Sequence, residues 1–281
     1  MAGILSGLKS LGLGDLEKRE LYEEEEKVIP IRKAEPKRSV VEEKDLIYDK
    51  SFSCPVCDEK FTSKVMKTGR TRLVSTDLDS RPIYEGIDSN KYDVVVCPEC
   101  GYAAMGSDFQ PLLSAQVKMV QEEICNKIKL QPPVGETYQY EEVIPRYRVA
   151  LACAIVKHGK DSEKAHICLH FAWLLRGYAQ MLEEEGKLTA EDAKELKEQE
   201  RECLQKALEG LVNARQKENL PICGMDQTSL DYIIAALAYE LGKATIAAKM
   251  VSEILVSPVA NSRIKDKARY LKQLILEEHK K

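Results

Sequence analysis

The sequence predicts an α+β protein, mostly α-helical, in which a small β-rich zinc ribbon is followed by a helical-repeat domain. Two observations carry this prediction. Two Cys-x-x-Cys pairs enclose a stretch rich in β-branched residues, and the chain beyond residue 111 shows the apolar spacing of one helix after another. With 281 residues, 44% of them hydrophobic, the chain is long and apolar enough for two folded units and a tail.

Residues 1–20 are expected to form a short amphipathic helix. Its apolar residues recur at helical spacing and would make one stripe: Met1, Ile4, Leu5, Leu8 and Leu11. Residues 21–45 follow as a disordered charged linker, acidic from Glu23 to Glu26 and then basic and broken by proline. A stripe of this kind can lie on a membrane surface, so Met1–Leu13 is a candidate for contact with the inner face of the membrane. Docking on protein, or a frayed end, is the alternative.

Residues 46–110 are predicted to be the metal module. Two Cys-Pro-x-Cys turns can aim four thiolates at one ion, and the predicted ligands are Cys54, Cys57, Cys97 and Cys100. A tight turn after each pair needs a residue that tolerates positive φ, which Asp58 and Gly101 provide. Backbone N–H groups in such turns point at the sulfurs and spread the thiolate charge.

Zinc is the favoured metal, and iron in a rubredoxin-like site is the alternative, because tetrahedral four-sulfur geometry suits both ions. A site with four cysteines and no nearby histidine closes around its ion, so the metal should be structural. Redox-active Cys-x-x-Cys motifs usually occur singly, at the start of a helix. This chain has two such pairs and neither opens an evident helix, which argues against a redox role.

Residues 111–281 are predicted to be helical with short breaks. The expected helices cover residues 112–130, 144–157, 162–185, 190–217, 228–241, 244–256 and 260–279. Suitable N-cap residues are Asp161 or Ser162, Thr189 and Thr228, and Pro145 suits a first turn. The helix over 162–185 is apolar nearly all round and should be central. Consecutive helices joined by short breaks favour tetratricopeptide-like packing over an irregular bundle.

The remaining cysteines and the histidine pair are interpreted as packing residues. The five other cysteines lie in helix-like sequence beside small apolar residues and should be reduced: Cys125, Cys153, Cys168, Cys203 and Cys223. His166 and His170 have the i, i+4 spacing of a metal-binding pair and share a stripe with Trp173. The glutamate of an HExxH motif is absent between them, which favours helix packing over catalysis.

The net charge argues against nucleic acid as a partner. The net charge is −4, whereas binding to the phosphate backbone needs dense positive charge. One basic stretch in the ribbon offers a nucleic-acid-binding alternative: Lys60, Lys64, Lys67, Arg70 and Arg72. Acidic residues, including Asp77, Asp79 and Asp93, balance it within residues 58–96, so a solvated hairpin is favoured. The chain shows neither a membrane-spanning apolar run nor a signal peptide, which predicts a cytoplasmic protein.

The ribbon resembles a bacterial family catalogued as domain of unknown function 2225. The resemblance rests on Cys54 to Cys57, the run from Asp77 to Ile87, Tyr92, the run from Val96 to Ala104, and more weakly Ala172 to Arg176. It covers residues 46–279 and implies a cytosolic bacterial protein with a metal ribbon and tetratricopeptide-like helices. It implies no activity, because that family is uncharacterised. Residues 1–40 resemble the start of the cell-division protein SepF, a membrane anchor followed by an acidic tether, although no SepF globular domain follows.

The sequence therefore predicts a non-enzymatic, zinc-binding adaptor that binds an unidentified protein through its helical domain. Motifs of serine hydrolases, P-loop enzymes and dinucleotide-binding enzymes are all absent from the sequence. The alternatives are a rubredoxin-like iron protein that transfers electrons and a nucleic-acid-binding zinc ribbon. The expected location is the cytoplasm, with peripheral contact to the inner face of the membrane as the variant.

Overall fold

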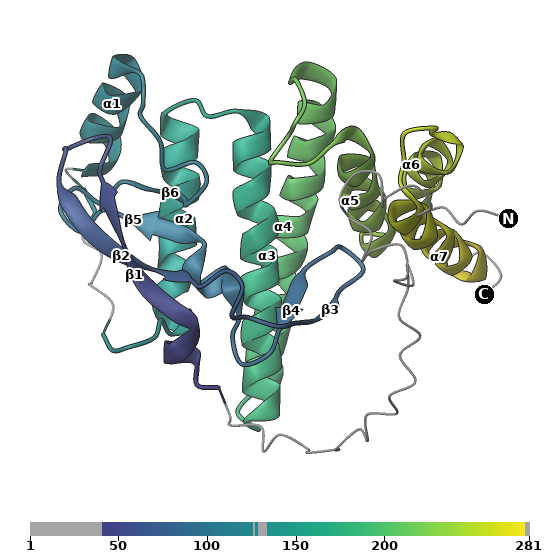
Figure 1. Cartoon of the computed structure of the whole chain (residues 1–281), viewed down its shortest axis with the longest axis horizontal. Helices are drawn as coiled ribbons and strands as arrows, with labels where there is room; N and C mark the ends of the chain where they lie inside the picture. Colours follow the sequence, from purple (N-terminus) through teal and green to yellow (C-terminus); the bar gives the residue numbers. More distant parts are fainter. Residues whose placement is uncertain (1–40, 126, 129–133, 279–281) are drawn as a thin grey trace, which may run out of the picture. The chain divides into compact units, whose positions relative to one another are not determined.

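Two β-hairpins, each built around one Cys-x-x-Cys pair, form the ribbon. β1 (Ile47–Ser53) pairs with β2 (Lys60–Met66), and β5 (Val94–Val96) pairs with β6 (Ala103–Met105), both antiparallel. Between the hairpins lies a third antiparallel pair, β3 (Leu73–Thr76) and β4 (Pro82–Tyr84). The three pairs are separate two-stranded sheets, and Figure 1 shows β3 and β4 apart from the other strands. No ladder hydrogen bond therefore joins the two cysteine hairpins within the described strands.

The computed structural model describes residues 41–125, 127–128 and 134–278. The helix predicted for residues 1–20 and the linker as far as residue 40 lie outside them. The described chain begins beside a short 3₁₀ helix, η3 (Glu43–Leu46), and a second one, η4 (Ser89–Tyr92), precedes β5.

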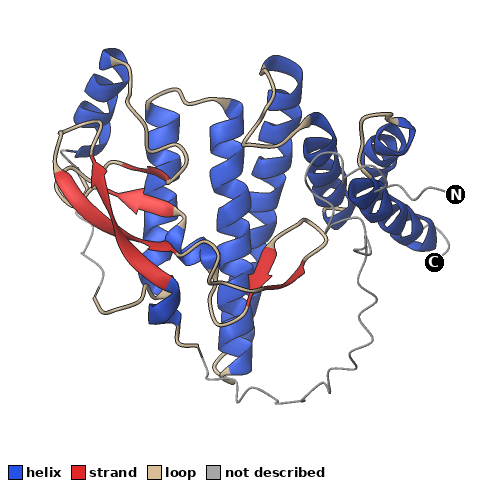
Figure 2. Cartoon of the chain, in the orientation of Figure 1, coloured by secondary structure: helices blue, strands red, loops and turns tan. Residues whose placement is uncertain are grey.

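Helices dominate the rest of the described chain, which confirms the predicted mostly α-helical α+β class (Figure 2). They are α1 (Ser114–Val120), the π-helical turn η5 (Gln121–Cys125), α2 (Tyr140–Val156), α3 (Asp161–Glu184), α4 (Ala190–Lys217), α5 (Gln227–Glu240), α6 (Ala244–Val256) and α7 (Ser262–Glu278). The bounds of α4 and α6 are those the sequence predicts. The π-helical turn shortens the first predicted helix, so its α-helical part ends at Val120.

The central helix is α3, as predicted, because it contributes to both hydrophobic cores. One core joins α3 to α4, α5, α6 and α7 and contains Leu211, Ile234 and Leu271, all fully buried. The other joins α3 and α2 to the cysteine hairpins and contains Tyr102 and Tyr147, both with 0% exposure. The ribbon therefore packs on the same helix that supports the helical domain.

The proline predicted for the first turn of α2 and the residue predicted to cap α5 both differ from the structure. α2 begins at Tyr140, so Pro145 lies inside the helix and not in its first turn. The earlier start is supported by Glu142, whose carboxylate accepts the backbone N–H of Gln139 at 3.0 Å, and a proline this close to the start removes a single backbone hydrogen bond. α5 is capped by Asp226, which accepts the Ser229 N–H at 2.7 Å, and not by Thr228.

Of the two other predicted caps, the one of α4 is confirmed and the one of α3 is not. Thr189 caps α4 by accepting the backbone N–H of Asp192 at 3.1 Å, as predicted. The predicted cap of α3 is wrong, because Asp161 and Ser162 are the first two residues of the helix and the N-cap residue is Lys160, whose side chain makes no capping bond. Glu218, at the end of α4, takes over the capping role, because its carboxylate accepts the Ser162 backbone N–H at 2.9 Å.

Candidate metal centre

The two Cys-x-x-Cys turns have the same backbone structure. In the first, the Asp58 N–H donates to the Cys54 carbonyl at 3.0 Å and Asp58 has φ of 60°. In the second, the Gly101 N–H donates to the Cys97 carbonyl at 3.0 Å and Gly101 has φ of 75°. Both residues adopt the left-handed conformation that the sequence predicts for them. Two equivalent turns thus face each other with their thiols inward.

The four sulfurs lie within 4.8 Å of one another, so Cys54, Cys57, Cys97 and Cys100 form a group that could hold a metal ion. The Sγ atoms of Cys54 and Cys100 are 3.5 Å apart, and those of Cys57 and Cys97 are 3.6 Å apart. Tetrahedral ligands at the usual zinc–sulfur distance would be ~3.8 Å apart. The donor set and spacing therefore fit a tetrahedral ion of the zinc or iron kind, and they do not identify which.

The buried thiols of Cys54 and Cys97 hold their protons more tightly than a free thiol does. A hydrogen bond with Cys100 and burial raise the pKa of the Cys54 thiol, and burial raises the pKa of Cys97 to about 11. Backbone N–H groups act in the opposite direction, including the Val56 N–H, which lies 3.4 Å from the Cys54 sulfur. Cysteine binds metal as the thiolate, so an ion bound here would displace the thiol protons.

The segment after the second pair packs over the site. Gln121 in η5 donates its side-chain amide to the Val56 carbonyl at 3.1 Å. Ile128 lies so close to Gly101 that a Cβ at position 101 would clash with the Ile128 side chain. Cys125 also lies here, and the Cys100 thiol is among the groups that shift its pKa. Cys125 is thus a neighbour of the candidate metal ligands, which helical spacing alone did not predict.

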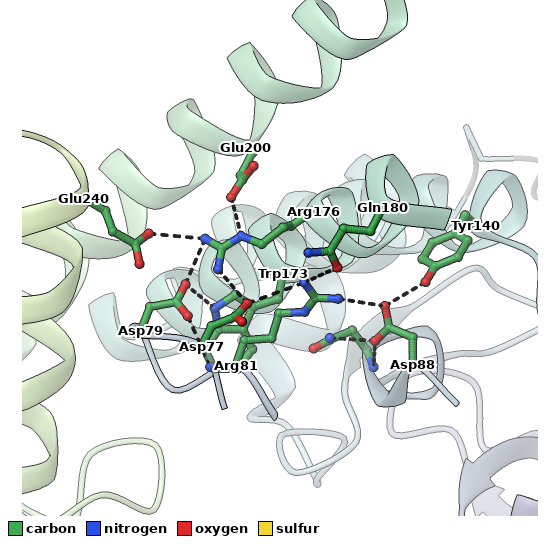
Figure 3. Close-up of polar contacts among 11 residues, drawn as sticks. Asp77, Asp79, Arg81, Asp88, Tyr140, Trp173, Arg176, Gln180, Glu200 and Glu240 are labelled. Carbon is green, nitrogen blue, oxygen red and sulfur yellow. Dashed lines mark hydrogen bonds and ion pairs between the residues drawn. The ribbon is translucent and has the colours of Figure 1, made fainter. Parts of the chain in front are cut away.

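The loop between β3 and β4 carries a buried acidic group that sequence reasoning missed (Figure 3). Asp79 has 0% exposure, and its carboxylate accepts the Trp173 indole N–H at 2.8 Å and pairs with Arg176 at 3.0 Å. The prediction of a solvated hairpin is therefore wrong for this residue. Donors on α3 compensate the burial of its charge. The sequence held one signal of this contact: Trp173 lies on the predicted central helix, and a buried indole N–H needs a hydrogen-bond acceptor.

Arg176 is the centre of the network in Figure 3. Its guanidinium contacts four carboxylates, those of Asp77 at 3.0 Å, Asp79 at 3.0 Å, Glu200 at 2.7 Å and Glu240 at 3.2 Å. Burial acts to lower the pKa of Arg176, but the carboxylates of Asp79, Glu200 and Glu240 together raise it. Burial, followed by the charge of Asp79, raises the pKa of Glu240 to about 7. The network thus holds more acidic groups than the guanidinium can neutralise.

A second arginine extends the network toward the ribbon. Arg81 donates to Gln180 on α3 at 3.0 Å, and its guanidinium lies 3.6 Å from Asp77 and 3.8 Å from Asp88 (Figure 3). Asp88 accepts the Tyr140 hydroxyl of α2 at 2.9 Å. These contacts attach residues 77–88 to the helices.

The histidine pair lies on the ribbon-facing side of α3 and is not part of the cysteine group. His170 Nδ1 is 2.7 Å from the Asp93 carboxylate, and His166 Nδ1 is 3.9 Å from that of Asp108. The rings of His166 and His170 meet edge to face with centroids 4.4 Å apart. Burial lowers the pKa of His170, although Asp93 acts to raise it. Packing of the pair agrees with the sequence interpretation, and its aspartate partners were not predicted.

Two further sets of residues stay outside the cysteine group. In the basic stretch, Lys64 pairs with Asp49 at 3.5 Å, and the Lys67 ammonium donates to the Asp45 carbonyl at 2.9 Å. Cys153 and Cys168 are buried among helices, and burial raises the pKa of each to about 11.

A polar cavity of about 560 Å³ lies where residues 107–116, 157–166 and 218–224 meet. The buried ammonium of Lys157 is paired there with Glu163 at 2.6 Å and donates to the Tyr102 hydroxyl at 3.1 Å. The Glu218 carboxylate, which caps α3, lines the same cavity. These charged groups thus hold the surrounding segments together.

Comparison with known proteins adds a family but no activity. The family model DUF2225, described as an uncharacterized protein conserved in bacteria, matches residues 47–275. An uncharacterized protein of Borreliella burgdorferi is 29% identical over 87 residues, which are 28% of this chain and 31% of that protein. The chain thus spans less than a third of that relative's length. No solved structure matches the chain. The likeness of residues 1–40 to SepF falls outside the described residues and stays a prediction.

Proposed function

We propose that this chain, which belongs to the DUF2225 family, is a non-enzymatic adaptor of the cytoplasm. In this proposal a structural zinc ion, bound by the four cysteines, holds the ribbon together. The helices α3–α7, which we interpret as tetratricopeptide-like, bind another protein. The observation that carries the proposal is the apolar surface on the last helices.

This surface begins in a groove of about 240 Å³ between α4, α5 and α6. Val212, Ile246 and Met250 are apolar residues of its lining, the fully buried Ile234 lies at its base, and the other lining residues are polar or charged: Arg215, Gln216, Thr245 and Lys249. Beyond the groove, the end of α6 and the turn to α7 expose further large apolar side chains, with Val256 at 81% and Val259 at 79% exposure. Terminal helices of repeat proteins usually turn a polar face to solvent, and exposed apolar patches mark binding sites.

Substitution in the groove should therefore reduce capture of the partner. With the full chain as bait in a lysate of its own organism, Ile246→Asp should lower recovery of the partner by about tenfold or more, as for a hot-spot residue. Val74→Asp is the matched control, because Val74 is 61% exposed on β3 and distant in sequence from the groove. Equal recovery with wild type, Ile246→Asp and Val74→Asp would count against the assignment of the groove.

Metal analysis of the purified native protein separates the adaptor from the rubredoxin-like alternative. We expect about one zinc ion per chain and a colourless protein, since a closed four-thiolate zinc site is structural. Near-stoichiometric iron with a red chromophore would instead support electron transfer. Iron would replace the zinc assignment without changing the ligands, because both ions accept four thiolates.

Contact with a membrane surface stays a prediction for residues 1–13. They lie outside the described residues, and within the described part of the chain no helix is both long enough and apolar enough to cross a bilayer.

A further inference from the structure

One face of α3 binds the ribbon through three successive side chains. His170, Trp173 and Arg176 are spaced i, i+3 and i+6, so they follow one another along the same side of the helix. Each binds an aspartate from the segment between the cysteine pairs: His170 binds Asp93 at 2.7 Å, Trp173 binds Asp79 at 2.8 Å, and Arg176 binds Asp77 at 3.0 Å. The rings of His170 and Trp173 also touch, with centroids 4.6 Å apart.

At one end, this row of contacts begins at the base of the hairpin that carries the second cysteine pair. Asp93 immediately precedes β5, the strand that leads into Cys97. Its carbonyl accepts the backbone N–H of Gly106, just beyond β6, at 2.7 Å. Asp93 is therefore positioned by the hairpin of the second cysteine pair. Since the two cysteine hairpins belong to separate sheets, a metal bound between them would fix this hairpin against the first.

At the other end, the same contacts reach the helices that form the proposed binding surface. The Tyr232 hydroxyl of α5 donates to the Leu78 carbonyl at 2.9 Å, and the Lys267 ammonium of α7 donates to the Ser80 hydroxyl at 3.2 Å. Glu240, the last residue of α5, pairs with Arg176 (Figure 3). The loop around Asp79 thus lies between α3 on one side and α5 and α7 on the other.

We propose that metal binding at the four cysteines controls how the β3–β4 loop holds α5 and α7, through the contacts Asp93–His170, His170–Trp173 and Trp173–Asp79. Each link is a hydrogen bond or ring contact between buried or half-buried groups, so a shift of the ribbon hairpin moves the next group along. The proposal rests on the proposed function in one respect, that α5–α7 carry the partner surface. Metal loading then regulates that surface.

The chain contains one tryptophan, and it lies in the middle of this row, so its fluorescence reports on the contacts. Metal should be removed from the full protein with a chelator, and its loss measured by metal analysis. Tryptophan emission should shift to the red as Trp173, which is 6% exposed, becomes accessible to water. Amide hydrogen exchange in α5 should become roughly 5–150-fold faster, the usual range of coupling between two sites. Both readouts work without a partner, so they test this proposal even if partner capture fails.

Asp93→Ala tests the same contacts without touching a cysteine. In the metal-loaded variant, we expect the red-shifted emission and faster α5 exchange, with metal content unchanged. Asp49→Asn is the matched control, because Asp49 pairs with Lys64 at the ribbon surface and takes no part in the row. Because Asp93→Ala is measured with its metal bound, it still tests the proposal if chelation unfolds the whole chain. Unchanged emission and unchanged α5 exchange in metal-loaded Asp93→Ala would overturn the proposal.

Discussion

Cys54→Ser is expected to lose the bound metal and to unfold both cysteine hairpins. Structural zinc contributes about 10–16 kcal/mol to folding in small zinc-binding peptides, more than two short hairpins can replace. The variant should therefore contain less than about a tenth of the wild-type metal, because one missing thiolate costs well over the 1.4 kcal/mol of a tenfold change in binding. Metal analysis and amide exchange in β1, β2, β5 and β6 measure the two effects.

Unfolding should be confined largely to the ribbon side of the molecule, while α4–α7 stay helical even where their amide exchange becomes faster. Cys54 and Cys97 belong to the core that α2 and α3 share with the hairpins, whereas α4–α7 pack with α3 in the other core. Far-UV circular dichroism should thus keep most of its helical signal. Cys203→Ser is the control, because Cys203 is half-buried on α4 and outside the four-cysteine group. A Cys54→Ser protein with wild-type metal content and thermal stability would contradict a structural metal.

The sequence predicted most of the helices and the cysteine cluster because both depend on local patterns. Apolar spacing repeats within each helix, so α4 and α6 could be bounded from their own residues. The turns at Asp58 and Gly101 depend on single residues that tolerate positive φ. In each case the residues that decide the structure lie within a few positions of one another.

The contacts of the β3–β4 loop could not be predicted in this way. Asp79 and Trp173 are 94 positions apart, and Leu78 and Tyr232 are 154 positions apart. Charge balance over residues 58–96 suggested a solvated hairpin, because a local count cannot show that α3 supplies the donors. The fold thus makes residues 77–88 part of the support for the helices, although they lie between the two cysteine pairs.

Arg176→Met should be the most damaging substitution outside the metal centre. Removing the guanidinium leaves four acidic side chains facing one another, with Asp79 fully buried. Removal of one partner from a buried ion pair typically costs about 3–5 kcal/mol, and we expect a loss of that size in the free energy of unfolding. Urea unfolding of the metal-saturated protein measures it. Arg269→Met is the matched control, since Arg269 is 61% exposed and pairs with Asp266 alone, and its cost should stay below about 1 kcal/mol.

The loss of unfolding free energy in Arg176→Met should also depend on pH, and the raised pKa of Glu240 determines the direction. Burial and Asp79 already raise the pKa of Glu240 from 4.5 to about 7 in the wild type, and loss of Arg176 removes the group that lowers it. A carboxyl group with a raised folded-state pKa contributes stability that is fully present below its unfolded pKa and is lost as pH rises through the folded value. The variant should consequently be closer to wild type at pH 5 than at pH 8. An equal loss of unfolding free energy at both values would mean that unpaired carboxylates are not the cause, and that Arg176 contributes mainly by packing its aliphatic stem.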